Sequence, residues 1–166
     1  MKLTKNSIIF LIITLLTITI IIPNTATAAT YQNEYQSKLE VYNLAGFQVG
    51  YAIVGQVITI DTTAERITHA TAGSMGAYAT FPLWSAEWGN PWWTYDTTPR
   101  NSHAKVKIWQ KISSPIWSEE GDLWNYVDYY GGNIVYVKAV IVGTSSSKSI
   151  NLANTLPDVI TIVLRR

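Results

Sequence analysis

Short apolar or alternating runs, separated by Gly, Pro, Asn and Ser, extend from about residue 38 to the end of the chain. This periodicity is typical of β-strands, and we find no convincing amphipathic helix in the same region. The pattern predicts strands at 38–43, 47–54, 56–61, 66–70, 77–81, 104–112, 134–142 and 159–164. So many short strands in about 130 residues indicate an all-β fold: a single antiparallel β-sandwich of about eight strands or, alternatively, a small β-barrel.

Two segments predict different kinds of strand. In 104–112 the apolar residues share one face and Lys105, Lys107 and Lys111 share the other, so we expect one face in the core and one in water. The lysines could also meet phosphates or acidic glycans, although a solvated strand face is the simpler interpretation. Segment 134–142 is apolar on both faces apart from Lys138, which is typical of a strand in the middle of a sheet.

The N-terminal segment has the layout of an export signal. Lys2 and Lys5 precede an apolar run at 8–22, and small residues at 26–29 fit an A-x-A cleavage site. The run has 15 residues, fewer than the roughly 20 needed to cross a bilayer as a helix. We therefore expect residues 1–28 to be a cleaved signal peptide and residues 29–166 to form one secreted, extracellular domain.

Composition argues against several classes of function. Without Lys2 and Lys5 the chain carries 10 basic and 11 acidic side chains, a balance with no general attraction to nucleic acid. It has no cysteine, so core packing and sheet pairing must stabilise it. His69 and His103 lack metal-ligand spacing and no phosphate-cradling loop is present, so we expect no metal and no cofactor.

Aromatic residues form the strongest anomaly, because all seven tryptophans lie between positions 84 and 124. Gly89 and Pro91 interrupt segment 83–101, which therefore predicts a long ordered loop rather than a helix. Aromatic side chains on loops suit sugar rings, choline-type head groups or a membrane interface. The predicted ligand-binding residues are Trp88, Trp92, Trp93, Tyr95, Trp124, Tyr126, Tyr129 and Tyr130. The alternative is that the tryptophans build the core.

The order of these aromatic features resembles that of a known family. Segment 90–95 (NPWWTY), the strand at 106–109 and segment 126–131 (YVDYYG) together are similar to actinoporin-like cytolysins and the related fungal fruit-body lectins. The resemblance implies a β-sandwich with a phosphocholine or glycan site formed by Trp92, Trp93, Tyr129 and Tyr130. The amphipathic N-terminal pore-forming helix of the cytolysins has no counterpart, so the resemblance implies surface binding more than pore formation.

One group of carboxylates suits an enzyme. Two tryptophans lie among the four carboxylates Glu119, Glu120, Asp122 and Asp128. Glycoside hydrolysis uses paired carboxylates beside the sugar ring, although a solvated acidic turn around Gly121 is the simpler interpretation. Oxygens of three of them could also converge on Ca²⁺, without the spacing of an EF-hand.

The sequence thus predicts a non-enzymatic binding protein whose partner is a glycan or a lipid head group on another surface, with a toxin-like or lectin-like role. Two alternatives stay open. One is a self-assembling surface or matrix protein that associates through an edge strand such as 134–142 or 159–164. The other is a small glycan-cleaving enzyme that uses the carboxylates.

Overall fold

The structure is a computed structural model that describes residues 29–132, 134–143, 147–153 and 159–165. The predicted signal peptide, residues 1–28, lies outside this part of the chain. Within the described residues all regular elements are strands. This part of the chain contains no helix of the length and apolarity needed to cross a membrane. The strands are β1 (Thr30–Tyr42), β2 (Gln48–Asp61), β3 (Arg66–Ala79), β4 (Ser85–Tyr95), β5 (Ser102–Ser114), β6 (Trp117–Tyr129), β7 (Val135–Gly143), β8 (Ser147–Ala153) and β9 (Val159–Arg165).

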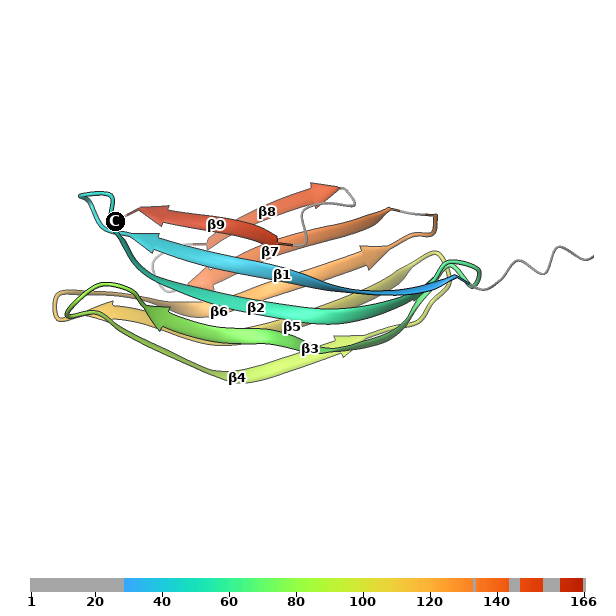
Figure 1. Cartoon of the computed structure of the whole chain (residues 1–166), viewed down its shortest axis with the longest axis horizontal. Coiled ribbons are helices and arrows are strands. Elements are labelled where there is room, and N and C mark those ends of the chain that lie inside the picture. Colours follow the sequence, from blue (N-terminus) through green and yellow to red (C-terminus); the bar gives the residue numbers. More distant parts are fainter. Residues whose placement is uncertain (1–28, 133, 144–146, 154–158, 166) are drawn as a thin grey trace, which may run out of the picture.

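The strands form two sheets that face each other as a sandwich (Figure 1). One sheet has the order β3-β2-β1-β9 and the other has the order β4-β5-β6-β7-β8. The predicted all-β sandwich is therefore confirmed, and the barrel alternative is wrong because the described strands form two separate sheets. Neighbours are antiparallel with one exception: β9 pairs in parallel with β1, from Gln36 opposite Val159 to Tyr42 opposite Arg165.

Three strands were missed or misjudged. Segment 83–101 is not a loop, because most of it forms edge strand β4, which tolerates Pro91 beside a bulge. The acidic turn around Gly121 is in fact the middle of β6, and β8 had no predicted counterpart. The predicted breaks near residues 55 and 71–76 are also wrong, since β2 and β3 continue through their glycines.

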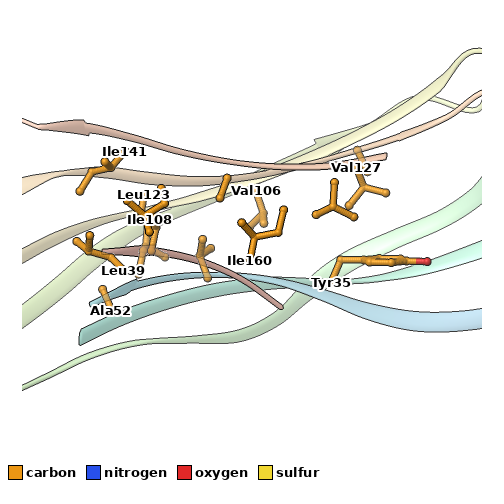
Figure 2. Close-up of a cluster of buried hydrophobic side chains, with 14 of the residues drawn as sticks. Tyr35, Leu39, Ala52, Val106, Ile108, Leu123, Val127, Ile141 and Ile160 are labelled. Carbon is orange, nitrogen blue, oxygen red and sulfur yellow. The ribbon is translucent and has the colours of Figure 1, made fainter. Parts of the chain in front are cut away.

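Alternating side chains from both sheets fill the core. In β5 the buried and half-buried positions alternate as the sequence predicts, with Val106 and Ile108 inside and the lysines outside. Their layer faces Leu39 and Ile160 of the opposite sheet (Figure 2). The expectation that 134–142 lies in the middle of a sheet is confirmed, because β7 pairs with β6 on one side and β8 on the other.

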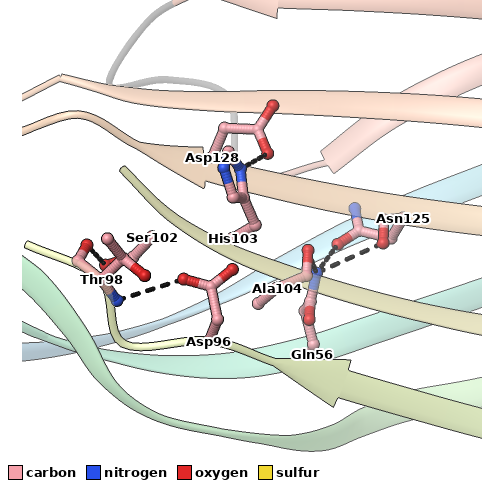
Figure 3. Close-up of polar contacts among 8 residues, drawn as sticks. All are labelled: Gln56, Asp96, Thr98, Ser102, His103, Ala104, Asn125 and Asp128. Atoms are coloured by element: carbon pink, nitrogen blue, oxygen red, sulfur yellow. Dashed lines mark hydrogen bonds and ion pairs between the residues drawn. The ribbon is translucent and has the colours of Figure 1, made fainter. Parts of the chain in front are cut away.

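A polar group joins the two sheets inside this core. The side-chain amide of Gln56 on β2 donates to Asn125 Oδ1 on β6 at 2.8 Å and to the carbonyl of Ala104 at 3.3 Å (Figure 3). Asn125 in turn donates to Ser37 Oγ on β1 at 3.0 Å. Because these buried groups satisfy one another, they hold the sheets in one lateral position.

Candidate functional site

The outer face of the five-stranded sheet collects aromatic and charged side chains. Cross-strand partners point to the same face of a sheet, so each row of partners can be followed from strand to strand. One row runs from Trp92 on β4 through Lys107 and Trp124 to Val140 on β7. The adjacent row contains Thr94, Lys105, Tyr126 and Lys138. These two rows form the candidate site, which we call the aromatic face.

Three rings of the aromatic face contact one another. Trp92 and Trp124 meet edge to face, with 5.9 Å between ring centroids and 70° between planes. Trp124 and Tyr126, two residues apart on β6, stack at 5.5 Å and 17°. Burial against these neighbours raises the pKa of the Tyr126 hydroxyl, and the charge of Lys107 opposes the shift. Such ring contacts hold the side chains in fixed positions before any ligand arrives.

Lysines lie over these rings. The Nζ atoms of Lys105, Lys107 and Lys138 lie 5.4, 5.0 and 5.7 Å from the ring centroids of Trp92, Trp124 and Tyr126 respectively. These distances are typical of cation–π contacts. Lys107 also forms an ion pair with Asp122 at 2.6 Å. Among the described residues, no carboxylate lies within ion-pair distance of Lys105 or Lys138, so these two ammonium groups are available to an anion.

Two shallow hollows open on the same face. One, of about 610 Å³, is lined by Asn90, Pro91, Trp92, Lys107 and Trp124. The other, of about 450 Å³, lies further along the strands between the end of β4 and Tyr126. It also contains Lys105, His103 and Asp128. A ligand that occupied both hollows would cross the aromatic face along the strand direction.

The second hollow is bounded by a polar pair. His103 Nδ1 lies 2.8 Å from Asp128 Oδ1 on the adjacent strand, as Figure 3 shows. The His103 ring also meets Tyr130 edge to face at 5.9 Å, and Tyr130 meets Tyr136 at 5.6 Å. The charge of Asp128, together with a smaller effect of burial, raises the pKa of the Tyr130 hydroxyl. These ring contacts place Tyr130 at the margin of the face. Because its pKa is raised, its hydroxyl is a neutral hydrogen-bonding group there.

A bulge in β4 decides which tryptophan reaches the aromatic face. Gly89 pairs with Trp109 and Trp92 pairs with Lys107, so β4 has one residue more than β5 across this interval. Asn90 takes a left-handed conformation there, with φ of 51°. The extra residue reverses the alternation, so that Trp88 points to the inner side of the sheet whereas Trp92 points outward.

Three predicted ligand residues consequently lie on the other side of β4. Trp88, Trp93 and Tyr95 pair with buried residues of β5, which places them on the inner side of the sheet. They are nevertheless 38–48% exposed because β4 is the edge strand. Tyr95 meets His69 of β3 edge to face at 5.8 Å, so it covers the open edge of the sandwich. Trp88 and Trp93 are therefore not brought together with Trp124 and Tyr126, whereas Tyr95 lines the second hollow together with Tyr126.

The prediction that Tyr129 contacts a ligand is wrong. Tyr129 is fully buried in the core, and its hydroxyl donates to the Gly132 carbonyl at 2.7 Å. Its neighbour Tyr130 lies beyond the strand and is half exposed. The four residues that the family resemblance puts in one site, Trp92, Trp93, Tyr129 and Tyr130, therefore lie in different places. Of the eight predicted residues, Trp92, Trp124 and Tyr126 form the aromatic face, Tyr95 lines its second hollow and Tyr130 lies at its margin.

Sequence reasoning assigned no ligand role to Lys138 and Tyr136, and it treated Lys105 as part of a solvated strand face. Alternation within 135–143 would have placed Tyr136 and Lys138 on one face. Their neighbours on β6, however, follow only from the strand register. Pairing between strands, rather than any local motif, makes these residues part of the face.

The four carboxylates proposed for catalysis are not gathered into one site. Glu119 points into the core, whereas Glu120 faces outward near Lys111, at 3.9 Å. Asp122 and Asp128 lie six residues apart on one strand, roughly 20 Å, which exceeds the separation of about 5–9.5 Å in glycosidases. The described residues also contain no group of three or more His, Asp or Glu side chains that could hold a metal ion.

No protein-family model matches the chain, and comparison with curated proteins and with solved structures gave no significant match. The resemblance to cytolysins and fruit-body lectins therefore stays a prediction.

Proposed function

We propose that the protein is a secreted, non-enzymatic binding protein whose aromatic face takes up an acidic glycan, one that carries carboxylate or sulfate groups. The observation that carries the proposal is the arrangement of Trp92, Trp124 and Tyr126 on one sheet face beside Lys105 and Lys138, two lysines that no described carboxylate pairs. Aromatic rings offer apolar surface to the C–H groups of a sugar ring, and ammonium groups offer charge to its acidic substituents.

The rings and lysines are arranged in a way that suits a chain of sugars. Tyr126 lies between Lys105 and Lys138 in one row, while Trp92 lies at the edge of the next row and is 42% exposed. One sugar unit of the ligand would stack on Trp92, and an acidic group on another unit of the same ligand would lie near Tyr126. The two hollows give such a ligand a path along the strands.

The charge on the aromatic face favours an acidic glycan over a choline head group. Aromatic cages for quaternary ammonium groups need free ring faces. Here Lys107 and Lys138 already lie over Trp124 and Tyr126 and would repel a second cation. Lys138 and Lys105, which form no ion pair with a described carboxylate, attract carboxylate or sulfate. We therefore assign the face to an anionic saccharide.

The proposal is tested by isothermal titration of residues 29–166 with a uronic-acid polymer, a sulfated glycan, a neutral glucan and phosphocholine. We expect heat with one of the acidic polymers and none with phosphocholine. Trp92→Ala should weaken binding about tenfold, because one ring contact is lost. Binding of the neutral glucan alone would contradict the role of the lysines.

Matched variants separate the aromatic face from general effects. Trp93→Ala removes a neighbouring ring that is 48% exposed but lies on the other side of β4, so binding should not change. Lys105→Gln should weaken binding and reduce its dependence on salt, because it removes one ionic contact. Arg66→Gln removes an exposed cation on the opposite sheet and should have no effect. Equal losses in Trp92→Ala and Trp93→Ala would overturn the assignment.

One observation favours self-association as a second candidate function. Segment 134–142 lies inside its sheet as β7, so this part of the self-assembly hypothesis is wrong. Strand β9, however, is the edge of the four-stranded sheet and is apolar in sequence. Edge strands of this kind can pair with another subunit. Light scattering over a range of protein concentrations would detect this self-association. Val163→Lys should prevent it, because it places a charge on the β9 edge.

A further inference from the structure

One end of the sandwich carries a group of exposed apolar side chains. The β1–β2 turn, the β3–β4 connection and the β5–β6 turn all lie at this end, which is also where β9 ends (Figure 1). Leu44, Leu83 and Ile116 lie one on each segment and are 95%, 86% and 95% exposed. We call segments 43–47, 80–84 and 114–117 the apolar end.

The remaining large side chains of the apolar end are also hydrophobic. Phe47 and Phe81 stack with their centroids 5.8 Å apart and are both exposed. Behind the tips, Trp84 and Trp117 pack against the core with 5.6 Å between their rings. A hollow of about 460 Å³ separates Leu44 from Ile116 and has the two tryptophans in its wall. Hydrophobic side chains thus extend from the core to the tips, and Asn43 and Ser114 are the polar residues in the wall of the hollow.

The backbone of the apolar end is hydrogen-bonded within itself. The amide of Phe47 donates to Asn43 Oδ1 at 2.9 Å, and the amide of Asn43 donates to the Phe47 carbonyl at 2.9 Å. In the second segment, the amide of Trp84 donates to the Phe81 carbonyl at 3.2 Å. In the third, the Ser114 hydroxyl donates to the Trp117 carbonyl at 3.3 Å. Backbone groups that are already paired can leave water at little cost.

Charge is absent from the same segments. The three segments contain no Asp, Glu, Lys or Arg, although such residues make up 14% of the chain. Charged side chains are what makes transfer of a loop into an apolar medium expensive. A protein partner would also need directional polar contacts, about one hydrogen bond per 100–200 Å² of interface. The apolar end offers few such groups, since Asn43 and Ser114 are already used.

We propose that the apolar end inserts into the interfacial region of a lipid bilayer, with Leu44, Leu83 and Ile116 entering the acyl-chain boundary. The tryptophan pair then lies at the head-group level, where tryptophan is enriched in membrane proteins. Insertion uses residues separate from the aromatic face. It therefore does not depend on glycan binding, and Trp92→Ala should leave it unchanged.

The absence of cysteine allows a direct test, because a single introduced thiol labels one position. Ile116→Cys carrying an environment-sensitive fluorophore is titrated with phosphatidylcholine vesicles, without and with an anionic lipid. We expect a blue shift and increased intensity at residue 116. Ile134→Cys is the matched control, because Ile134 is 49% exposed at the opposite end of the sandwich, where no shift is expected.

Vesicle sedimentation supplies the second measurement. Leu44→Ser combined with Ile116→Ser should reduce the partition coefficient about tenfold or more, whereas Ile134→Ser should not change it. Both tip positions are almost fully exposed, so the variant should fold normally, with an unchanged thermal midpoint. No shift at residue 116 with either vesicle would overturn the proposal. A concentration-dependent dimer without vesicles, abolished by Ile116→Ser, would overturn it in favour of a second copy of the chain.

Discussion

The carboxylate of Glu34 on β1 reaches across β2 and accepts a hydrogen bond from the backbone amide of Ser74 on β3, at 2.7 Å. Two glycines leave room for it. A Cβ atom on Gly55 would lie 2.8 Å from Glu34 Oε1, and one on Gly73 would lie 2.6 Å from the same atom. The side chain therefore connects three strands at the point where β3 departs from regular pairing.

Glu34 should make the free energy of unfolding decrease at acidic pH. Burial opposes its ionisation, but hydrogen bonds from Ser74 and Gln36 outweigh burial and lower the pKa of the carboxyl. Because the folded pKa is the lower one, the stabilisation is present above the unfolded pKa and is lost as pH falls through the folded pKa. Glu34→Gln should lower the free energy of unfolding by about 1 kcal/mol at pH 7. In a plot of the thermal midpoint against pH, the variant should show a smaller decrease on the acidic side. An unchanged decrease would contradict this role.

Gly73→Ala should act through the same carboxylate. The added methyl group displaces Glu34 Oε1, so the amide of Ser74 loses its acceptor. The cost of Gly73→Ala should therefore be largely absent when Glu34→Gln is already present, a non-additive pair in a double-mutant cycle. Denaturant titrations of the four proteins measure the coupling, and full additivity would show that the glycine is needed for another reason.

Two buried glutamines should respond in opposite directions to substitution by Met. Gln56 is hydrogen-bonded to Asn125 and Ala104, so Gln56→Met should leave these partners unsatisfied and cost about 2–3 kcal/mol. Gln110 is also fully buried, but neither side-chain atom has a partner among the described residues. Gln110→Met should therefore stabilise the fold by about 1 kcal/mol. Urea unfolding of both variants gives the comparison, and a destabilised Gln110→Met protein would contradict it.

Two strand glycines should differ in their tolerance of Ala. A Cβ atom at Gly121 would lie 2.3 Å from the Val142 carbonyl oxygen and 2.5 Å from Gly143 Cα. Since backbone atoms cannot move aside cheaply, Gly121→Ala should destabilise the fold by about 2–4 kcal/mol. Gly89 has no atom within 4 Å of that position, so Gly89→Ala should change stability by less than about 0.5 kcal/mol. Differential scanning calorimetry of the two variants checks both values.

The sequence predicted the parts of the fold where apolar alternation is unbroken. Val106 and Ile108 mark the buried side of β5, and the apolar run after Ile134 marks a central strand; both interpretations are confirmed. β6 escaped detection because Glu119 and Asn125 occupy two of its inward positions, which hides the apolar period. Asn125 is a satisfactory core residue only because Gln56 and Ser37 come from distant strands to meet it.

The aromatic face shows why clustering in sequence is a weak guide to a site. Trp92 and Trp93 are adjacent, as are Tyr129 and Tyr130, yet each pair is divided between different surroundings. Alternation places Trp92 and Trp93 on opposite faces, and the bulge at Asn90 decides which of the two faces outward, whereas Tyr130 lies beyond the end of β6. A bulge depends on pairing with β5, so its effect on Trp92 is not visible in the composition of segment 83–101.

The parallel pair of β1 and β9 joins the two ends of the sandwich domain in one sheet. This contact closes a loop that contains all the other strands, and a long loop is slow to close because its ends must find each other against chain entropy. Ile160, Ile162 and Leu164 enter the core only when β9 docks. The core should therefore stay loosely packed until β9 has paired with β1.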